Sequence, residues 1–127
     1  MRSELEGLRI LVADDNTDAG DTLAMLLRSE GAEVLVERDG EGALLALRDW
    51  TPGVALLDIT MPGLDGYEVA RRVRADVRTC SILMVAISAW AEDDDRRRSR
   101  MAGFDHHLNK PVAFSRLLEI LTAAVHH

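Results

Sequence analysis

Cysteine is almost absent from this sequence, and its absence excludes two ways of stabilising a small protein. The 127 residues include one cysteine, Cys80. A single cysteine forms no internal disulfide and supplies too few ligands for a zinc site, so neither a disulfide-rich secreted scaffold nor a zinc finger is expected. A chain of this length buries roughly two-thirds of its unfolded surface without such support. We therefore expect one compact domain over residues 1–127, with its core at about 8–125.

Long hydrophobic runs are also missing. The longest apolar run in a strand-like segment covers residues 82–87, whereas a membrane helix needs about 20 residues. Residues 1–7 (MRSELEG) carry acidic side chains where a signal peptide would have a positive segment followed by an apolar one. These absences predict a cytoplasmic protein that does not associate with a membrane.

Basic residues are outnumbered by acidic ones. Fifteen Lys and Arg stand against 22 Asp and Glu, and the formal net charge is −7. Such a charge repels the phosphate backbone unless the basic residues are strongly segregated, so direct binding of nucleic acid is not expected. Lysine is the scarcest charged type, since Lys110 is the only one. Its position therefore bears on function.

The sequence does have a regular alternation of two hydrophobic patterns. Continuous apolar runs, typical of parallel strands buried on both faces, alternate with segments of helical spacing. The strands are predicted at residues 8–13, 34–36, 54–57, 82–87 and 106–108, and the helices from 17 to a cap at Gly31 and at 41–50, 67–74, about 92–102 and 113–125. Five strand–helix repeats predict an α/β fold with a parallel sheet, right-handed crossovers and helices on both faces.

Apolar residues in three of these segments predict which side chains are buried. Both Met84 and Met101 are expected to fill the core. The first helix is expected to bury one face, formed by Ala19, Leu23, Leu26 and Leu27.

The fourth predicted helix is dominated by charge. Each of three acids precedes an arginine by four residues, in the pairs Glu92/Arg96, Asp93/Arg97 and Asp94/Arg98. This is the favourable orientation for ion pairs, and the acids lie at the positive end of the helix. We expect a solvated, self-paired face. The alternative is that the arginines meet an acidic partner.

Polar residues follow the predicted strands where each strand ends. Asp14 and Asp15 follow the first strand, Asp58 the third, Ser88 the fourth and Lys110 the fifth. Taken singly, each has a simpler role as a helix cap, a turn residue or a solvated charge; Asn16 competes with Asp15 for the first cap. The ends of parallel strands, however, meet along one edge of the sheet. We therefore expect all five side chains to converge on one shallow site.

Three converging carboxylates favour a bound cation. Two of them about 4 Å apart repel by about 4 kcal/mol at an effective dielectric near 20. Oxygen ligands without His or Cys favour a hard ion, and a shallow site suits Mg²⁺, which retains several waters. A carboxylate beside Mg²⁺ and an ammonium group can attack a phosphoryl group and form an aspartyl-phosphate. Asp58 is the natural acceptor.

In this order the residues resemble the receiver domain of response regulators, the phosphoacceptor module of two-component signalling. The resemblance covers essentially the whole chain. It rests on Asp14-Asp15, the segment LDITMPGLDG at 57–66, Ser88-Ala89 and Asn109-Lys110-Pro111. It implies a flavodoxin-like (βα)5 sandwich with strand order 2-1-3-4-5.

The resemblance also implies a role for each site residue. Asp58 would be phosphorylated, and Asp14, Asp15 and Asp58 would hold Mg²⁺ together with the backbone carbonyl of Thr60. The ammonium group of Lys110 would pair with the phosphoryl group.

Five positions have further roles implied by the resemblance. Ser88 would donate its hydroxyl to a phosphoryl oxygen, and a cis peptide bond before Pro111 would help to aim the lysine. His107 stands where relatives have an aromatic residue that turns inward; the alternative is that it only fills a half-buried strand position. Thr60 and Trp90 occupy positions that control water near the acyl phosphate. The large Trp90 is expected to lengthen the phosphorylated lifetime.

The resemblance implies a signalling switch rather than an enzyme. Its phosphoryl donor would be a phosphohistidine on a histidine kinase or a histidine phosphotransfer protein. Its downstream protein partner would bind the face made of the fourth helix, the fifth strand and the fifth helix. The chain would be a stand-alone regulator or the receiver of a larger hybrid kinase.

Two other classes are weighed against this one. A Mg²⁺-dependent phosphatase of the haloacid-dehalogenase type also uses an aspartyl-phosphate. It needs a second acid two residues after the nucleophile, where this chain has Thr60, and a cap domain. A flavin-binding module needs a phosphate-cradling loop after the first strand, where this chain has two acids.

Overall fold

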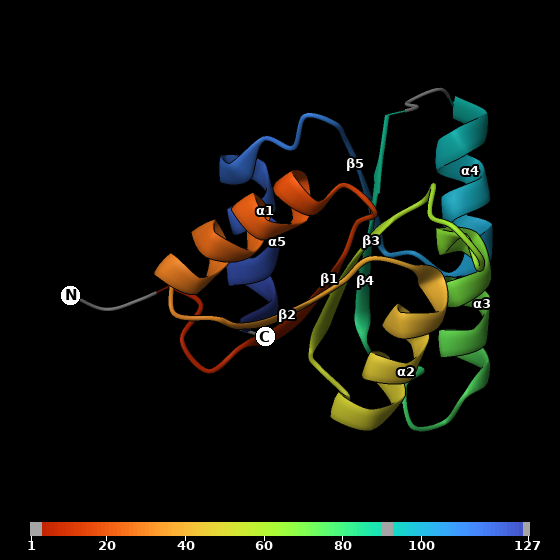
Figure 1. Cartoon of the computed structure of the whole chain (residues 1–127), viewed down its shortest axis with the longest axis horizontal. Coiled ribbons are helices and arrows are strands. Elements are labelled where there is room, and N and C mark those ends of the chain that lie inside the picture. Colours follow the sequence, from red (N-terminus) through yellow and green to blue (C-terminus); the bar gives the residue numbers. More distant parts are fainter. Residues whose placement is uncertain (1–3, 90–92, 126–127) are drawn as a thin grey trace.

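Five strands and five helices alternate along the chain in the computed structural model, which describes residues 4–89 and 93–125 (Figure 1). The predicted order of elements is confirmed, and the strand ends lie within one residue of those expected. The elements are β1 (Arg9–Ala13), α1 (Thr17–Ser29), β2 (Glu33–Glu37), α2 (Gly40–Trp50), β3 (Val54–Asp58), α3 (Gly66–Ala75), β4 (Leu83–Ser88), α4 (Asp93–Ala102), β5 (His106–Asn109) and α5 (Phe114–Val125). Within the described ranges, no helix combines the length and the apolar character needed to cross a bilayer.

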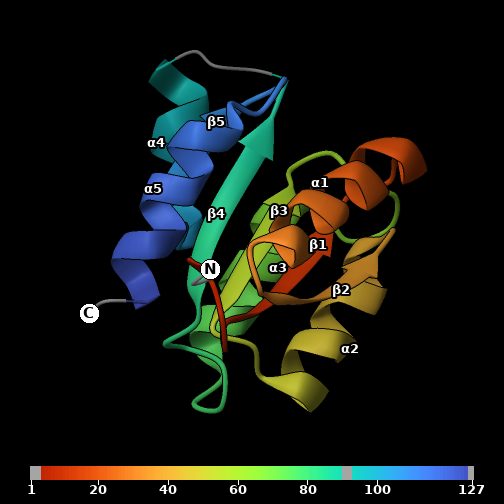
Figure 2. The ribbon, with the colours of Figure 1, turned by 90° about the vertical axis from the view of Figure 1, so that its left-hand side faces the viewer.

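The strands form one parallel sheet in the order β2-β1-β3-β4-β5. This is the flavodoxin-like order that the resemblance implies. Val12 in β1 pairs with Val36 on one side and Leu56 on the other, so β1 lies inside the sheet, as do β3 and β4. Figure 2 shows the strands running in the same direction, so that their carboxyl ends reach one edge.

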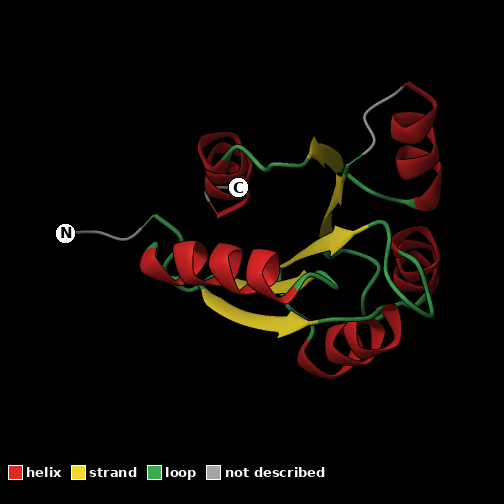
Figure 3. Ribbon diagram, turned by 45° about the horizontal axis from the view of Figure 1, so that its top comes forward, coloured by secondary structure: helices red, strands yellow, loops and turns green. Residues whose placement is uncertain are grey.

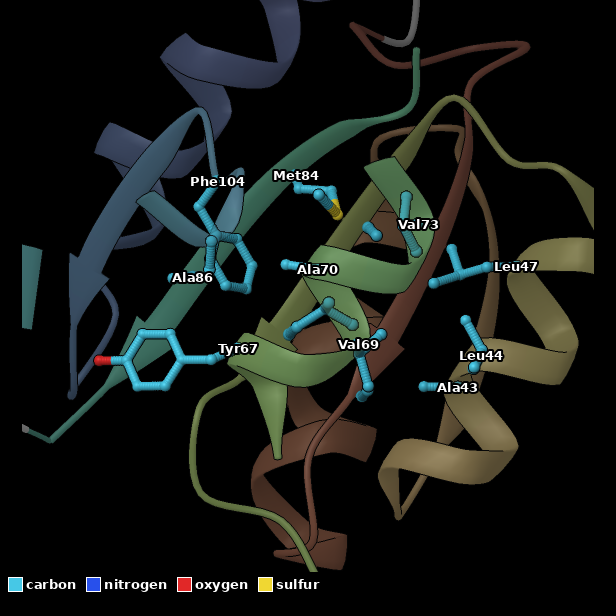
Figure 4. Packing of buried hydrophobic residues seen from close by; sticks show 14 of the residues in the cluster. Ala43, Leu44, Leu47, Tyr67, Val69, Ala70, Val73, Met84, Ala86 and Phe104 are labelled. Carbon is cyan, nitrogen blue, oxygen red and sulfur yellow. The ribbon is translucent and has the colours of Figure 1, made fainter. Parts of the chain in front are cut away.

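Side chains of successive strand residues enter two separate cores, one on each face of the sheet. Helices α1 and α5 cover one face, and α2, α3 and α4 cover the other (Figure 3). The core under α1 and α5 takes Ile10, Val12, Leu56, Val85 and Ile87 from the strands. The core under α2, α3 and α4 takes Leu11, Leu57, Met84 and Ala86, and Tyr67 and Phe104 close it near α4 (Figure 4). Because both faces are covered, the three inner strands β1, β3 and β4 are apolar without alternation, whereas the edge strands β2 and β5 also carry polar residues.

Short polar side chains begin the first three helices. The side chain of Asn16 accepts a hydrogen bond from the amide of Ala19 at 3.0 Å, and Asp39 and Asp65 cap α2 and α3 in the same way. Asn16 is therefore the cap of α1, and Asp15 is left available to the sheet edge. Gly31, at φ +97°, ends α1 as predicted, in a conformation that suits glycine.

Two predictions about burial are partly wrong. In α1 the buried positions are Gly20, Ala24 and Leu27, whereas Ala19 is exposed and Leu26 is 41% exposed. The apolar spacing of α1 fits two adjacent stripes, and the helix turns the stripe with Gly20 toward the sheet, where Val36 packs against it. Similarly, Met84 is fully buried but Met101 is 81% exposed, because α4 turns Met101 away from β5.

Candidate functional site

The polar residues at the strand ends are placed by backbone hydrogen bonds that continue beyond the strands. Asp58 and Ser88 are the last residues of β3 and β4, and Asp14 and Lys110 directly follow β1 and β5. The amide of Asp14 donates to the carbonyl of Glu37 at 3.0 Å, and the amide of Lys110 donates to the carbonyl of Ser88 at 2.8 Å. The sheet itself therefore brings these four residues to one edge.

Three carboxylates meet at this edge. One oxygen from each of Asp14, Asp15 and Asp58 lies within 4.8 Å of the others. Asp14 and Asp58 are buried, and Asp15 is exposed. Backbone amides hold the buried pair: Asn16 donates to Oδ1 of Asp14 at 2.9 Å, and Thr60 donates to Oδ1 of Asp58 at 3.1 Å.

Lys110 closes the site from the other side. Its Nζ donates to Oδ2 of Asp58 at 2.8 Å and lies 3.2 Å from Oδ2 of Asp14. The peptide bond between Lys110 and Pro111 is cis, as the resemblance implies. The single lysine of the chain thus lies against two of the three acids.

Burial raises the pKa of Asp58 above its usual value. The hydrogen bond and charge of Lys110 and the amide of Thr60 oppose this effect, and the charge of Asp14 adds to it. For Lys110, burial favours the neutral amine, but the hydrogen bond and charge of Asp58 and the charge of Asp14 outweigh burial and raise its pKa. Lys110 therefore stays protonated, and the site remains short of positive charge.

The donor set suits a divalent cation. One ammonium group faces three carboxylates whose oxygens lie within 4.8 Å, and no His or Cys belongs to this cluster of described residues. A set made only of oxygens, with one side open to water, is the environment that Mg²⁺ prefers. The residues present therefore fit the ion predicted from the sequence.

A glycine lets α3 begin directly behind Asp58. A Cβ at Gly66 would lie 2.8 Å from the carbonyl oxygen of Asp58 and 2.9 Å from Cα of Ile59. The amide of Gly66 also donates to the carbonyl of Ile59 at 2.9 Å. Only glycine permits this close approach, which holds the loop after β3 against the site.

The remaining predicted residues lie around this centre. Ser88 is 3% exposed and lines a cavity of about 290 Å³ with Thr60. His107 is half-buried on β5, and its Nδ1 lies 2.7 Å from Oγ of Ser99 on α4. This contact was not predicted, because no sequence signal links a serine in a charged helix to a histidine in the following strand. Trp90 lies outside the described residues.

Helix α4 does not pair its charges as predicted. The ion pair that the structure shows between its described residues joins Arg97 to Asp94, three residues earlier, at 3.7 Å. The guanidinium of Arg98 lies instead over the ring of Tyr67 on α3, 4.6 Å from its centroid. The pairing of Asp94 with Arg98 is therefore wrong, since an aromatic face from another helix competes for the arginine. The pair that begins at Glu92 lies outside the described residues.

A groove of about 790 Å³ runs between α4, β5 and α5. We call it the α4–α5 groove. Apolar residues in its lining include Phe104, Leu108, Pro111 and Ile120. Its arginines are Arg96, Arg97, Arg100 and Arg116. It lies on the face that the resemblance assigns to the downstream partner.

Comparison with known proteins places the chain in a family. Residues 10–122 match the family described as response regulator receiver domain. The chain therefore belongs to the response regulator receiver domain family. Receiver domains of this kind are signalling switches in two-component systems rather than enzymes proper, which decides against the phosphatase and flavin-binding alternatives.

Individual relatives agree with this assignment. Protein PilG of Pseudomonas aeruginosa is 30% identical over 125 residues, covering 98% of this chain and 93% of PilG. Protein PilH of the same organism is 33% identical over 118 residues, covering 92% of this chain and 97% of PilH. The receiver domain of the sensor histidine kinase PA1611 of P. aeruginosa PAO1 is 30% identical, with a TM-score of 0.87 over 95% of this chain and 99% of that domain. That crystal structure has a magnesium ion coordinated in its active site cleft.

Proposed function

We propose that this chain is a phosphorylation-controlled switch that accepts a phosphoryl group from a phosphohistidine onto Asp58. The observation that carries the proposal is the contact of Lys110 Nζ with Oδ2 of Asp58 at 2.8 Å, within a cluster of three carboxylates at the sheet edge. A carboxylate oxygen of Asp58 attacks phosphorus, the P–N bond of the phosphohistidine breaks, and the released imidazole takes up a proton. The product is an acyl phosphate on Asp58.

Asp14, Asp15 and Asp58, with the backbone carbonyl of Thr60, would hold Mg²⁺. When bound, the ion supplies positive charge that offsets the charge on the transferring phosphoryl oxygens. In the proposal, Lys110 neutralises a second phosphoryl oxygen, and the hydroxyl of Ser88 donates to a third. The phosphoryl group carries about −1.5 to −2 charges where the carboxylate carried one, and its acceptor oxygens reorient these two side chains.

The response of the domain would reach a protein partner through the α4–α5 groove. His107 lines this groove on β5, two residues before the end of the strand. In the proposal it follows the movement of Ser88, and Trp90 limits the access of water to the acyl phosphate. We propose residues 1–127 as one receiver domain, and a histidine kinase or a histidine phosphotransfer protein as the phosphoryl donor. The match to PilG and PilH over most of each chain supports this assignment.

Phosphorylation by a small donor tests the acceptor directly. Phosphoramidate contains a P–N bond, as phosphohistidine does, and acetyl phosphate is a second donor. With Mg²⁺, intact mass spectrometry of the parent chain is expected to show a gain of one phosphoryl group, and Asp58→Asn is expected to show none. Asp49→Asn, an exposed acid on α2, is the matched control and is expected to behave like the parent. Equal phosphorylation of Asp58→Asn and the parent would place the acceptor elsewhere.

A further inference from the structure

Ser99 is a buried polar residue on an otherwise exposed helix. The buried positions of α4 among the described residues are Ser99 and Ala102, and Ser99 is 1% exposed. A buried hydroxyl destabilises a protein unless it has a hydrogen-bond partner. Its Oγ lies 2.7 Å from Nδ1 of His107. The one buried hydroxyl that α4 presents to the sheet is therefore used to contact β5.

His107 lies between the acceptor site and this serine. In the parallel register, His107 pairs with Ala86, and Asn109 pairs with Ser88. Residues two apart on a strand share a face, so His107 and Ser88 lie on the same face of the sheet, on neighbouring strands. The contact with Ser99 shows that α4 covers this face at His107. His107 therefore lies between Ser88 and α4, where a displacement of Ser88 can reach the helix through it.

The contact survives a change in the protonation of the imidazole. A serine hydroxyl can donate to an unprotonated Nδ1 and can accept from a protonated one. A second contact reinforces it, because Nη1 of Arg96 donates to the carbonyl of His107 at 3.4 Å. Helix α4 thus contacts both the imidazole ring and the backbone carbonyl of His107.

We propose that Ser99 is a positioning residue that transmits the phosphorylation state of Asp58 to α4 through its hydrogen bond to His107. The inference rests on the proposed function and adds a regulatory link to it. A rotation of the imidazole either moves Ser99 with it or breaks the bond, and α4 responds in both cases. Without the hydroxyl, His107 turns without pulling α4, because the remaining contact of Arg96 is with the backbone carbonyl of His107 and not with its ring.

Amide NMR spectra of the parent chain and of Ser99→Ala test this link, with Mg²⁺ and beryllium trifluoride as the phosphoryl analogue. In the parent, the analogue is expected to shift the amide resonances of residues 58–60 and those of residues 97–102. In Ser99→Ala the shifts at 58–60 remain, while most of the shift at 97–102 is lost, because the hydrogen bond that links α4 to the ring of His107 is absent. Ser99→Thr restores the hydroxyl and is expected to recover the α4 shifts.

Two further variants separate coupling from a merely structural effect. Met101→Ala changes an exposed position on the same helix and is expected to leave both sets of shifts unchanged. His107→Phe removes the partner nitrogen, so adding Ser99→Ala to it is expected to cause no further loss. Parent spectra without shifts at 58–60 would overturn the proposed function itself. Shifts at 58–60 together with undiminished α4 shifts in Ser99→Ala would overturn only the role of Ser99.

Discussion

The acidic edge of the sheet and helix α4 are attached to the domain by different kinds of contact. At the edge, Asp14 and Asp58 are buried, and their positions follow from the ladder of the central strands. Helix α4 buries two of its described residues and is held by individual side-chain contacts, such as Arg98 over Tyr67. Regions with few buried contacts open at lower free energy than central strands. The comparison teaches that the acids and Lys110 lie on the rigid part of the domain, whereas α4 is its more adjustable part.

The largest effect is expected on the rate of phosphorylation when the ammonium group of Lys110 is removed from the acidic edge. Lys110→Ala leaves the Asp58 carboxylate without its partner at 2.8 Å. The phosphoryl group then lacks the ammonium that would offset its developing charge, and the rate of phosphorylation by phosphoramidate is expected to fall about 100-fold. Rates are measured by intact mass against time. Arg116→Ala, in the α4–α5 groove, is the control. An equal loss of rate in both variants would show that the loss of a positive charge, rather than the contact with Asp58, slows phosphorylation.

Magnesium is expected to stabilise the same edge. At a concentration about 100 times its dissociation constant, a ligand of the folded state adds about 2.7 kcal/mol to the free energy of unfolding. For a chain of this size the melting temperature then rises by about 10 °C. Asp15→Asn removes the exposed carboxylate proposed to bind the ion and is expected to reduce this rise while leaving the melting temperature in EDTA unchanged. A full rise in Asp15→Asn would exclude Asp15 from the metal site.

Burial of Asp58 predicts a smaller effect on stability without metal. Because the pKa of Asp58 is raised in the folded state, its contribution to stability is present below the ordinary carboxyl pKa and is lost as the pH rises through the folded value. Asp58→Asn removes this loss, so the variant is expected to exceed the parent by about 1 kcal/mol at pH 7 in EDTA. Urea unfolding at pH 3 and pH 7 measures the difference. A less stable variant at pH 7 would show that the bond to Lys110 outweighs burial.

The smallest effects on the free energy of unfolding are expected from variants of α4. Two of them compare a tertiary contact of this helix with an ion pair within it. Arg98→Ala removes the cation–π contact with Tyr67 and is expected to lower the free energy of unfolding by about 0.5–1 kcal/mol. Arg97→Ala removes an exposed ion pair with Asp94 and is expected to cost less than about 0.5 kcal/mol. Thermal or urea unfolding of both variants gives the comparison. The reverse order would mean that local charge pairing, rather than tertiary contact, holds this helix.

The elements and the acidic edge could be predicted because they depend on local signals. Continuous apolar runs identify buried parallel strands, and a polar residue that ends such a run lies at the edge where parallel strands finish. Asp14, Asp58 and Lys110 were found in this way. The contact of Ser99 with His107 had no such signal, because a serine within a charged helix is usually solvent-exposed.

Local patterns in the amino-acid sequence set the period of each segment and the polarity of the strand ends, and hence the meeting of Asp14, Asp58 and Lys110. These properties depend on neighbouring residues and on the direction shared by parallel strands. Packing between distant elements set the rest: which stripe of α1 is buried, the contact of Arg98 with Tyr67 rather than Asp94, and the contact of Ser99 with β5. Such choices depend on surfaces that folding brings together from distant parts of the chain, and the spacing within one helix does not encode them.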